Sequence, residues 1–267
     1  MAGDPIRVAV CGALGRMGRE VSAGVAADPE LTLVGGVDVR AEASHYTVPG
    51  AGQVALDRTV DGLLGRVAAD VMVDFTHPEA VLANVRAAMA RGVSVVVGTT
   101  GISSEGLAEI AELSRAHGVG AVVAPNFAVG ANLMMYFAKV AARFLPAAEI
   151  IELHHDGKAD APSGTALSTA RAMLEARGAD LQDAKTTTFT LEGVRGGEIG
   201  GIRIHSVRLP GLVAHQEVIF GGQGQTLTIR HDSLSRESFL PGVRLAIKEV
   251  VRRRTFVYGL DTLMGLS

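Results

Sequence analysis

The sequence predicts an α/β protein with a doubly wound parallel sheet, followed by a second α+β domain with a mixed or antiparallel sheet. Two observations lead to this fold class. From residue 6 to about residue 124, apolar runs typical of strands alternate with helical patterns, which is the order that forms a parallel sheet. After Asn126 the alternation stops, and strand-like runs with few helices follow between glycine-rich turns.

The elements of the first part follow from apolar patterns and helix-end signals. Strands are expected at residues 6–11, 31–37, 71–75, 93–97 and 120–124. Helices are expected at residues 16–27, from 76–78 to about 91, and from 103 or 104 to about 117. Thr76 can cap the second of these helices, Pro78 fits its first turn, and Gly92 ends it.

The second part is expected to begin with a helix at 132–144, a strand at 149–155 and a helix at 163–177. Ser163 is suited to cap the latter helix, and Gly178 stands just past its end. Further strands are expected at 186–191, 202–208, 215–220 and 226–231. A last helix at 239–253 has apolar residues at helical spacing, and we expect it to pack back on the first part.

Composition narrows the function. The chain has 267 residues, 48% of them hydrophobic, which is enough for two domains with a substantial core. Its 25 basic and 28 acidic residues give a net charge of -3, which argues against a nucleic-acid partner. The single cysteine, Cys11, excludes an intrachain disulfide and fits a reducing compartment. With no signal-peptide pattern and no charge-free apolar run of spanning length, a cytoplasmic protein without a membrane partner is expected.

A glycine-rich turn, Gly12-Ala-Leu-Gly15-Arg-Met-Gly18, joins the first predicted strand to the first helix. Glycines allow the backbone to approach a pyrophosphate, and the N–H groups of the following helix attract its charge. The spacing differs from the usual G-x-G-x-x-G, so the pattern alone is a weak signal. Its position between strand and helix nevertheless favours a Rossmann-like dinucleotide site over a turn without a ligand.

Asp38 ends the second predicted strand, where a carboxylate can bind both ribose hydroxyls of NAD. Arg40 is placed either to meet the 2′-phosphate of NADP or to be a solvated loop residue, so both NADH and NADPH are candidates. Two further loops, Gly98-Thr-Thr-Gly101 and Ala124-Pro-Asn-Phe127, follow strands at the same sheet edge. Each alone fits ordinary turn chemistry, but together with the glycine loop they indicate a nicotinamide–ribose site.

A second cluster comprises His154, His155 and Lys158. A hydride added to an unsaturated ring leaves negative charge that must be protonated, and histidine is the natural acid near neutral pH. Lysine can hold a substrate carboxylate or supply a proton. Neighbouring strand residues face opposite sides, so one histidine is expected to be the acid and the other a substrate clamp or a support. The same argument makes adjacent histidines poor metal ligands, and no metal is expected. The turn Ser163-Gly-Thr165 can offer the amides of a helix start to a substrate carboxylate, or it can serve only to cap that helix.

Taken together, these motifs resemble those of the 4-hydroxy-tetrahydrodipicolinate reductase (dihydrodipicolinate reductase) family of the lysine and diaminopimelate pathway. The similar segments occur in order over nearly the whole chain, and the histidine–lysine stretch is the specific one. They are Gly12–Gly18, Val73-Asp-Phe-Thr76, Gly98–Gly101, Pro125-Asn-Phe127, Ile151-Glu-Leu-His-His-Asp-Gly-Lys-Ala-Asp-Ala-Pro-Ser-Gly-Thr-Ala166 and Tyr258-Gly-Leu-Asp-Thr-Leu-Met264.

The resemblance implies a dinucleotide-binding domain at residues 1–128 and 239–267, and a substrate-binding and oligomerisation domain at 129–238. It implies NADPH or NADH, a small cyclic dicarboxylate substrate and a homotetramer. His154 would be the proton donor and Lys158 the second catalytic group. The substrate would be held by His155, Ser163, Gly164 and Thr165. The dinucleotide would be lined by Gly12, Ala13, Leu14, Gly15, Arg16, Met17, Asp38, Gly98, Thr99, Thr100, Ala124, Pro125, Asn126 and Phe127.

The sequence departs from the family pattern at one position, and two rival functions are also considered. Members of the family that strongly use the phosphorylated cofactor often have an arginine directly after the acidic residue, whereas here Val39 stands there and Arg40 follows. The rivals are another two-domain reductase of the aspartate-derived pathway, such as a homoserine-type dehydrogenase, and a non-catalytic redox sensor that binds a dinucleotide. The His-His-x-x-Lys stretch argues against the first. The second should have lost the acid and the ammonium group, which this chain keeps.

Overall fold

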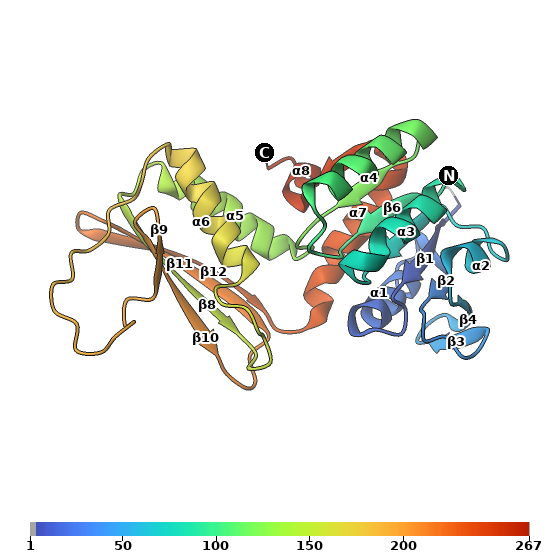
Figure 1. Cartoon of the computed structure of the whole chain (residues 1–267), viewed down its shortest axis with the longest axis horizontal. Helices are drawn as coiled ribbons and strands as arrows, with labels where there is room; N and C mark the ends of the chain where they lie inside the picture. The colour runs from blue at the N-terminus through green and yellow to red at the C-terminus, as the bar shows by residue number, and fades with distance from the viewer. Residues whose placement is uncertain (1–3, 267) are drawn as a thin grey trace. The chain divides into compact units, whose positions relative to one another are not determined.

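The computed structural model describes residues 4–266 (Figure 1). Main-chain contacts divide the chain into two units. One unit comprises the chain up to Val129 together with the segment from Arg236 onward, and the other is Gly130–Ser235. Among the described residues, no helix is long and apolar enough to cross a membrane.

The first unit is built on an eight-stranded sheet with the order β13-β7-β6-β5-β1-β2-β4-β3. Neighbouring strands are parallel except for the edge strand β3, which is antiparallel to β4, so the predicted parallel sheet is confirmed. The strands are β1 Ile6–Cys11, β2 Leu31–Val37, β3 His45–Val48, β4 Gly52–Asp57, β5 Val71–Asp74, β6 Ser94–Val97, β7 Ala121–Val123 and β13 Phe256–Tyr258.

Helices cover both faces of this sheet, because every central strand is apolar on both sides. In β1, Val8 and Val10 pack on one side and Ala9 and Cys11 on the other. The first side carries α1 Arg16–Ala26, α7 Leu240–Arg253 and α8 Leu260–Met264, and the second carries α2 Val60–Leu64, α3 Pro78–Met89 and α4 Ser104–His117. The last long helix, α7, therefore packs on the first unit as expected, and the short 3-10 helix η1, Arg236–Phe239, leads into it.

The order of the strands creates a switch point at β1. This strand lies between β2 and β5, so the chain first builds the sheet to one side of β1 and then to the other. In open parallel sheets, ligands bind at the carboxyl ends of the strands where the order reverses. The glycine loop that follows β1 lies at that position.

Two local predictions in the first unit have different outcomes. Ser103 caps α4 by accepting a hydrogen bond from the amide of Gly106 at 3.2 Å. This agrees with the prediction that the helix begins at residue 103 or 104. The cap of α3 is His77 and not Thr76. The hydroxyl of Thr76 instead donates to Oδ1 of Asp74 at 2.7 Å, so it is engaged with the preceding strand.

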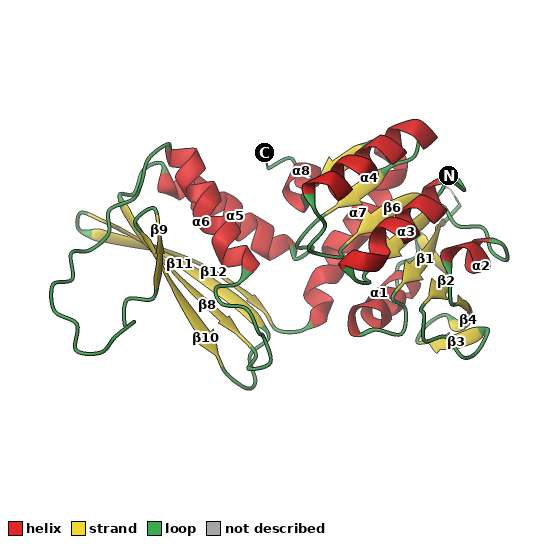
Figure 2. Cartoon of the chain, viewed as in Figure 1, coloured by secondary structure: helices red, strands yellow, loops and turns green. Residues whose placement is uncertain are grey.

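The second unit contains a five-stranded mixed sheet with the order β12-β11-β8-β10-β9. Only β8 and β10 pair in parallel, because the chain returns to that edge through α6. The strands are β8 Ala147–His154, β9 Gly197–Ile199, β10 Ile202–Arg208, β11 Ala214–Gly222 and β12 Gln225–Ser233. Helices α5 Val129–Ala142 and α6 Gly164–Arg177 lie along one face of this sheet (Figure 2).

One predicted strand of the second unit is wrong. Residues 186–191 form a loop rather than a strand, and their side chains are exposed. The other boundaries agree within a few residues, and Ser163 and Gly178 are the two caps of α6. Strand alternation then sets up the site: Ala148 and Ile150 of β8 enter the core against α6, and Glu152 and His154 continue along the same face.

Candidate active site

The glycine loop of the first unit has the backbone shape that a close-lying phosphate requires. Gly12 has a φ of +76°, and a Cβ there would lie 2.6 Å from the carbonyl oxygen of Phe75. A Cβ on Gly18 would overlap the carbonyl oxygen of Gly12. Gly15 is the N-cap of α1 and provides no capping side chain, so the first turn of α1 is open to an anion. These residues therefore fit the pyrophosphate of a dinucleotide.

Replacement of Gly18 by alanine tests this fit. The added methyl group would press on the carbonyl of Gly12, and the loop would have to move. We expect at least about a tenfold weaker dinucleotide affinity and a loss of about 1–3 kcal/mol in the free energy of unfolding. Fluorescence titration and thermal unfolding measure both. Gly197→Ala is the control, because a Cβ there meets nothing within 4 Å. Unchanged dinucleotide affinity in the Gly18 variant would refute a phosphate-binding loop.

One of the other predicted cofactor loops, Gly98–Thr100, is tied to the same sheet edge through Asp74, the last residue of β5. Its Oδ1 accepts hydrogen bonds from the hydroxyls of Thr76 and Thr99 at 2.7 and 2.8 Å. Its Oδ2 accepts from the side-chain amide of Asn84 at 2.8 Å. Asp74 is fully buried, so this carboxylate ties the loop after β5 to the Gly98–Thr100 loop after β6. No role was predicted for Asp74 from the sequence, although its position at the end of a buried strand was a usable signal.

The loop after β7 lies at that edge as well. Ala124 and Phe127 are buried, whereas Pro125 is exposed. The ring of Phe127 packs against that of Phe75 with their centroids 5.8 Å apart. The residues predicted to line the dinucleotide thus all belong to the first unit and follow the carboxyl ends of β1, β2, β6 and β7.

Asp38 and Arg40 are not independent of each other. Both oxygens of Asp38 accept from the guanidinium of Arg40, at 2.9 and 3.0 Å, and Oδ2 also accepts from the amide of Leu14 at 3.0 Å. Burial would raise the pKa of Asp38, but the bonds from Arg40 and Leu14 prevail and keep it below its ordinary value. The Arg40 side chain is 63% exposed and that of Asp38 only 5%, so the arginine is the outer partner.

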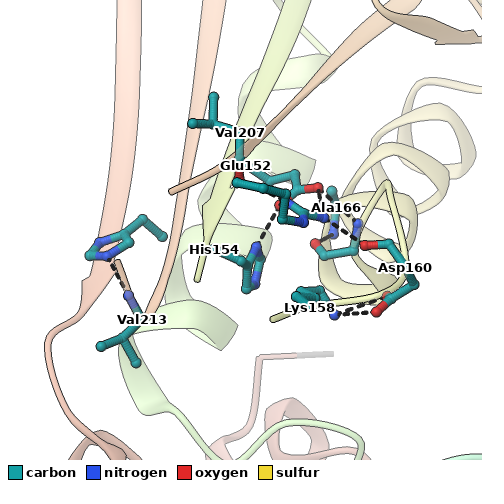
Figure 3. Close-up of polar contacts among 10 residues, drawn as sticks. Glu152, His154, Lys158, Asp160, Ala166, Val207 and Val213 are labelled. Carbon is teal, nitrogen blue, oxygen red and sulfur yellow. Dashed lines mark hydrogen bonds and ion pairs between the residues drawn. The ribbon is translucent and has the colours of Figure 1, made fainter. Parts of the chain in front are cut away.

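In the second unit, His154 is the last residue of β8, and its Nδ1 lies 2.5 Å from Oε2 of Glu152 (Figure 3). Glu152 is fully buried, and Arg208 binds its two oxygens at 2.9 and 2.8 Å. Burial alone would raise the pKa of Glu152, but hydrogen bonds from Arg208, Ser206 and His154 hold it below its ordinary value. Burial lowers the pKa of His154, and the Glu152 carboxylate opposes that shift without cancelling it.

Strand β8 ends between the two histidines, so His155 already belongs to the following turn. That turn carries Lys158, whose Nζ binds both carboxylate oxygens of Asp160 at 2.7 and 2.9 Å (Figure 3). The charge of Lys158 lies close enough to His154 to contribute to the lowered pKa of the imidazole, after the larger effects of burial and Glu152. The ammonium group of Lys158 therefore already binds a carboxylate.

The start of α6 completes this group of residues. Ser163 is buried, its hydroxyl accepts from the amide of Ala166 at 3.2 Å, and its own amide donates to Oε1 of Glu152 at 3.2 Å. Gly164 and Thr165 are the first two residues of the helix. A Cβ on Gly164 would meet nothing within 4 Å, so the helix start is open at this point. Its positive end favours a carboxylate.

No role was predicted from the sequence for Glu152 or Arg208. The alternation of β8 could have placed Glu152 on the same face as His154. Arg208 is 54 positions beyond His154, and only the pairing of β10 with β8 brings it opposite that residue. Within residues 4–266, no group of three or more His, Cys, Asp or Glu side chains could hold a metal ion.

Two models of known protein families match this chain. A model described as "Dihydrodipicolinate reductase, N-terminus" matches residues 6–127, and one described as "Dihydrodipicolinate reductase, C-terminus" matches residues 130–264. The chain belongs to the dihydrodipicolinate reductase family. It is therefore an oxidoreductase, and the resemblance inferred from the sequence is confirmed.

Individual relatives of the family agree. The chain is 53% identical to the 4-hydroxy-tetrahydrodipicolinate reductase of Moorella thermoacetica over 263 residues, which cover 97% of this chain and 98% of the relative. It is 52% identical to that of Dehalococcoides mccartyi, with 98% and 99% covered. A dipicolinate-bound dihydrodipicolinate reductase from Paenisporosarcina sp. TG-14 has a similar structure, with a TM-score of 0.86, 41% identity, and 97% and 99% covered. The scyllo-inositol dehydrogenase of Lactobacillus casei, 12% identical with a TM-score of 0.63, shares the fold.

Proposed function

We propose that this chain reduces 4-hydroxy-tetrahydrodipicolinate to tetrahydrodipicolinate, with loss of water, in diaminopimelate and lysine biosynthesis. The observation that carries the proposal is the gathering of an imidazole, an ammonium group and an open helix start within residues 154–165. This set offers a proton and two binding positions for carboxylates. Its members are His154, Lys158, Gly164 and Thr165, with Ser163 as the cap that orients the helix start.

The substrate is a dianion, and the site contains two cationic features suited to it. Lys158 now binds the carboxylate of Asp160, which occupies the position that a substrate carboxylate would take. The second carboxylate would bind at the first turn of α6, with His155 beside it. Holding both ends fixes the ring relative to His154, and such positioning accounts for much of an enzymatic rate enhancement.

A nicotinamide dinucleotide, held by the glycine loop and the loops after β2, β6 and β7, supplies a hydride when bound. The chain's own contribution to the chemistry is then a proton. His154 carries its hydrogen on Nδ1 toward Glu152, so Nε2 is the atom that takes up and delivers the proton. The positive charges of Lys158 and of the helix start stabilise negative charge on the substrate during the reaction.

Both NADPH and NADH are proposed as donors, with Arg40 setting the preference. A 2′-phosphate would bind the exposed guanidinium of Arg40, whereas the ribose hydroxyls of NADH would have to compete with Arg40 for the oxygens of Asp38. Val39, which stands directly after the acidic residue, is 70% exposed and apolar and offers neither interaction.

Arg40→Ala therefore has a specific expected result. We expect the KM for NADPH to rise about ten- to a hundredfold, which corresponds to a lost charge-assisted hydrogen bond of about 1.5–3 kcal/mol. The KM for NADH should stay the same or fall, because Asp38 is released. Steady-state kinetics with both dinucleotides measure the ratio, and Val39→Ala is the control that should leave it unchanged. Equal changes for the two dinucleotides would show that Arg40 does not meet the phosphate.

The proposed function is tested by a steady-state assay with freshly generated substrate, run in parallel with NADPH and NADH. We expect oxidation of the dinucleotide that depends on the cyclic dicarboxylate. Turnover only with another intermediate of the aspartate-derived pathway would favour the rival reductase. Dinucleotide binding without turnover on any dicarboxylate would favour a sensor.

We also propose an assembly and a location for this chain. We propose a homotetramer whose contacts are made by the second unit, following the family resemblance, and sedimentation analysis would test it. A cytoplasmic location is proposed because the chain has one cysteine, Cys11, which is buried and forms no disulfide.

A further inference from the structure

The Glu152 carboxylate is buried where strand β8 leaves the apolar core of the second unit. It is fully inaccessible, whereas the preceding inward residues, Ala148 and Ile150, are apolar. Burying a lone charge is costly unless hydrogen bonds and an opposite charge compensate for it. A carboxylate at this position therefore needs a full set of partners, and the identity of those partners indicates what it does.

Besides the contact with Ser206, the two oxygens of Glu152 accept four hydrogen bonds from His154, Arg208 and Ser163. Oε2 accepts from Nδ1 of His154 at 2.5 Å and from Nη1 of Arg208 at 2.9 Å. Oε1 accepts from Nη2 of Arg208 at 2.8 Å and from the amide of Ser163 at 3.2 Å. One carboxylate thus connects the proposed acid, the end of β10 and the residue that caps α6.

Arg208 extends this network to the loop that carries Lys158. Its Nη2 also donates to the carbonyl oxygen of Asp160 at 2.6 Å, and the side chain of Asp160 binds Lys158. The Glu152–Arg208 pair is therefore connected by hydrogen bonds to His154, to the cap of α6 and, through Asp160, to Lys158.

The pair also decides which nitrogen of His154 carries hydrogen. Arg208 can only donate, and an ionised carboxylate can only accept, so Nδ1 must be the donor toward Glu152. Nε2 is left for the substrate side. In other enzymes a buried carboxylate fixes an imidazole in the same way and stabilises its protonated form.

We propose that Glu152, held by Arg208, is a positioning residue that fixes the tautomer and orientation of His154 and keeps the imidazole in register with the start of α6. The inference rests on the proposed function, because it concerns the same site. The rival explanation is a structural ion pair that merely joins β8 to β10. The two explanations differ in whether Glu152 acts through His154.

Glu152→Gln separates them. Because Arg208 can only donate, the glutamine carbonyl must face Arg208 and its NH2 group must face His154, which moves the ring hydrogen to Nε2 and disfavours the imidazolium. We expect kcat to fall at least about tenfold. The pH midpoint of the acid-dependent rate should also move to lower pH. The sign follows from the charges around the ring: Glu152 raises the pKa of His154, whereas Lys158 and Arg208 lower it, so loss of the carboxylate leaves only the lowering charges.

Arg208→Lys serves as the second variant. It keeps the positive charge but loses the forked contact with Glu152 and the bond to Asp160. We expect a lower kcat and a higher KM for the dicarboxylate, with the pH midpoint unchanged. The control is Glu109→Gln, because Glu109 is also bound by a guanidinium fork, from Arg86 at 2.5 and 2.8 Å, in the first unit. It should leave kcat and the midpoint as in the wild type.

A double-mutant cycle gives the decisive comparison. If Glu152 acts through His154, Glu152→Gln should cost less than about twofold in kcat in a His154→Ala background. A cost equal to that in the wild-type background would show a structural role only and would overturn the inference. Far-UV circular dichroism and thermal unfolding show whether the second unit, which carries these substitutions, is folded in each variant.

Nitrogen-15 NMR of the histidine rings tests the same point without activity. We expect His154 to carry hydrogen on Nδ1 in the wild type and on Nε2 in Glu152→Gln. The same tautomer in both proteins would contradict the inference. If the wild type lacked turnover but the two proteins differed in the His154 tautomer as expected, only the proposed function would be refuted. The two failures can therefore be told apart.

Discussion

Replacement of His154 by alanine is expected to lower kcat by about 10²- to 10⁴-fold, the range typical of a lost general acid, with little change in the KM of either substrate. The reason is that Nε2 of His154 supplies the proton, whereas the carboxylates of the substrate are held by other groups. Steady-state kinetics measure the two constants separately. His117→Ala, which removes an exposed histidine of the first unit, is the control.

The pH dependence of the wild-type rate should also reflect the titration of His154. An acid must be protonated, so the rate falls as pH rises through the pKa of His154, and burial places that pKa below its ordinary value in the free enzyme. Two bound carboxylates favour the protonated ring. The midpoint in kcat should therefore lie at a higher pH than the midpoint in kcat/KM. A His154→Ala variant that kept wild-type kinetics, or the same pH limb, would remove His154 from the mechanism.

Replacement of Lys158 by alanine is expected to damage both constants. We expect the KM for the dicarboxylate to rise about ten- to a hundredfold, because one charge-assisted contact of about 1.5–3 kcal/mol is lost. The kcat should fall as well, since the ring is no longer held in register with His154 and negative charge is no longer stabilised. Folding should be little affected, because Lys158 pairs with Asp160, which is 61% exposed and can be solvated.

Two further variants test whether the effect of Lys158→Ala comes from the lost charge at this position. Lys158→Arg keeps the charge and should recover part of the substrate affinity, whereas Lys185→Ala, which removes an exposed lysine of the same unit, should change nothing. If KM were unaffected in Lys158→Ala and only kcat fell, the residue would act as a proton donor without holding a carboxylate.

Much of the fold could be predicted where local chemistry decides it. The caps of α6 follow from Ser163 and Gly178, because a hydroxyl at the start and a left-handed glycine at the end each satisfy backbone groups locally. The strand predicted at residues 186–191 is wrong because its apolar spacing has no neighbouring strand to pair with. The short elements β3, β4 and α2 were missed because they are edge and connecting pieces with little periodicity.

The candidate site shows the same division. His154 and Lys158 were predicted from one contiguous stretch of sequence. The Glu152–Arg208 pair was not, because it depends on parallel pairing between β8 and β10 across 56 positions. The competition between Asp38 and Arg40 was foreseen only as two alternatives, because their mutual hydrogen bonds are a property of the folded loop.

We expect residues 154–165 to hold a cyclic dicarboxylate next to its proton source. A crystal structure of this protein with pyridine-2,6-dicarboxylate would show whether they do. We expect one carboxylate within hydrogen-bonding distance, about 3 Å, of the amides at the start of α6. The other should replace Asp160 on Lys158, with Nε2 of His154 facing the ring. A dicarboxylate bound elsewhere, with the side chains of His154 and Lys158 out of contact, would contradict the account.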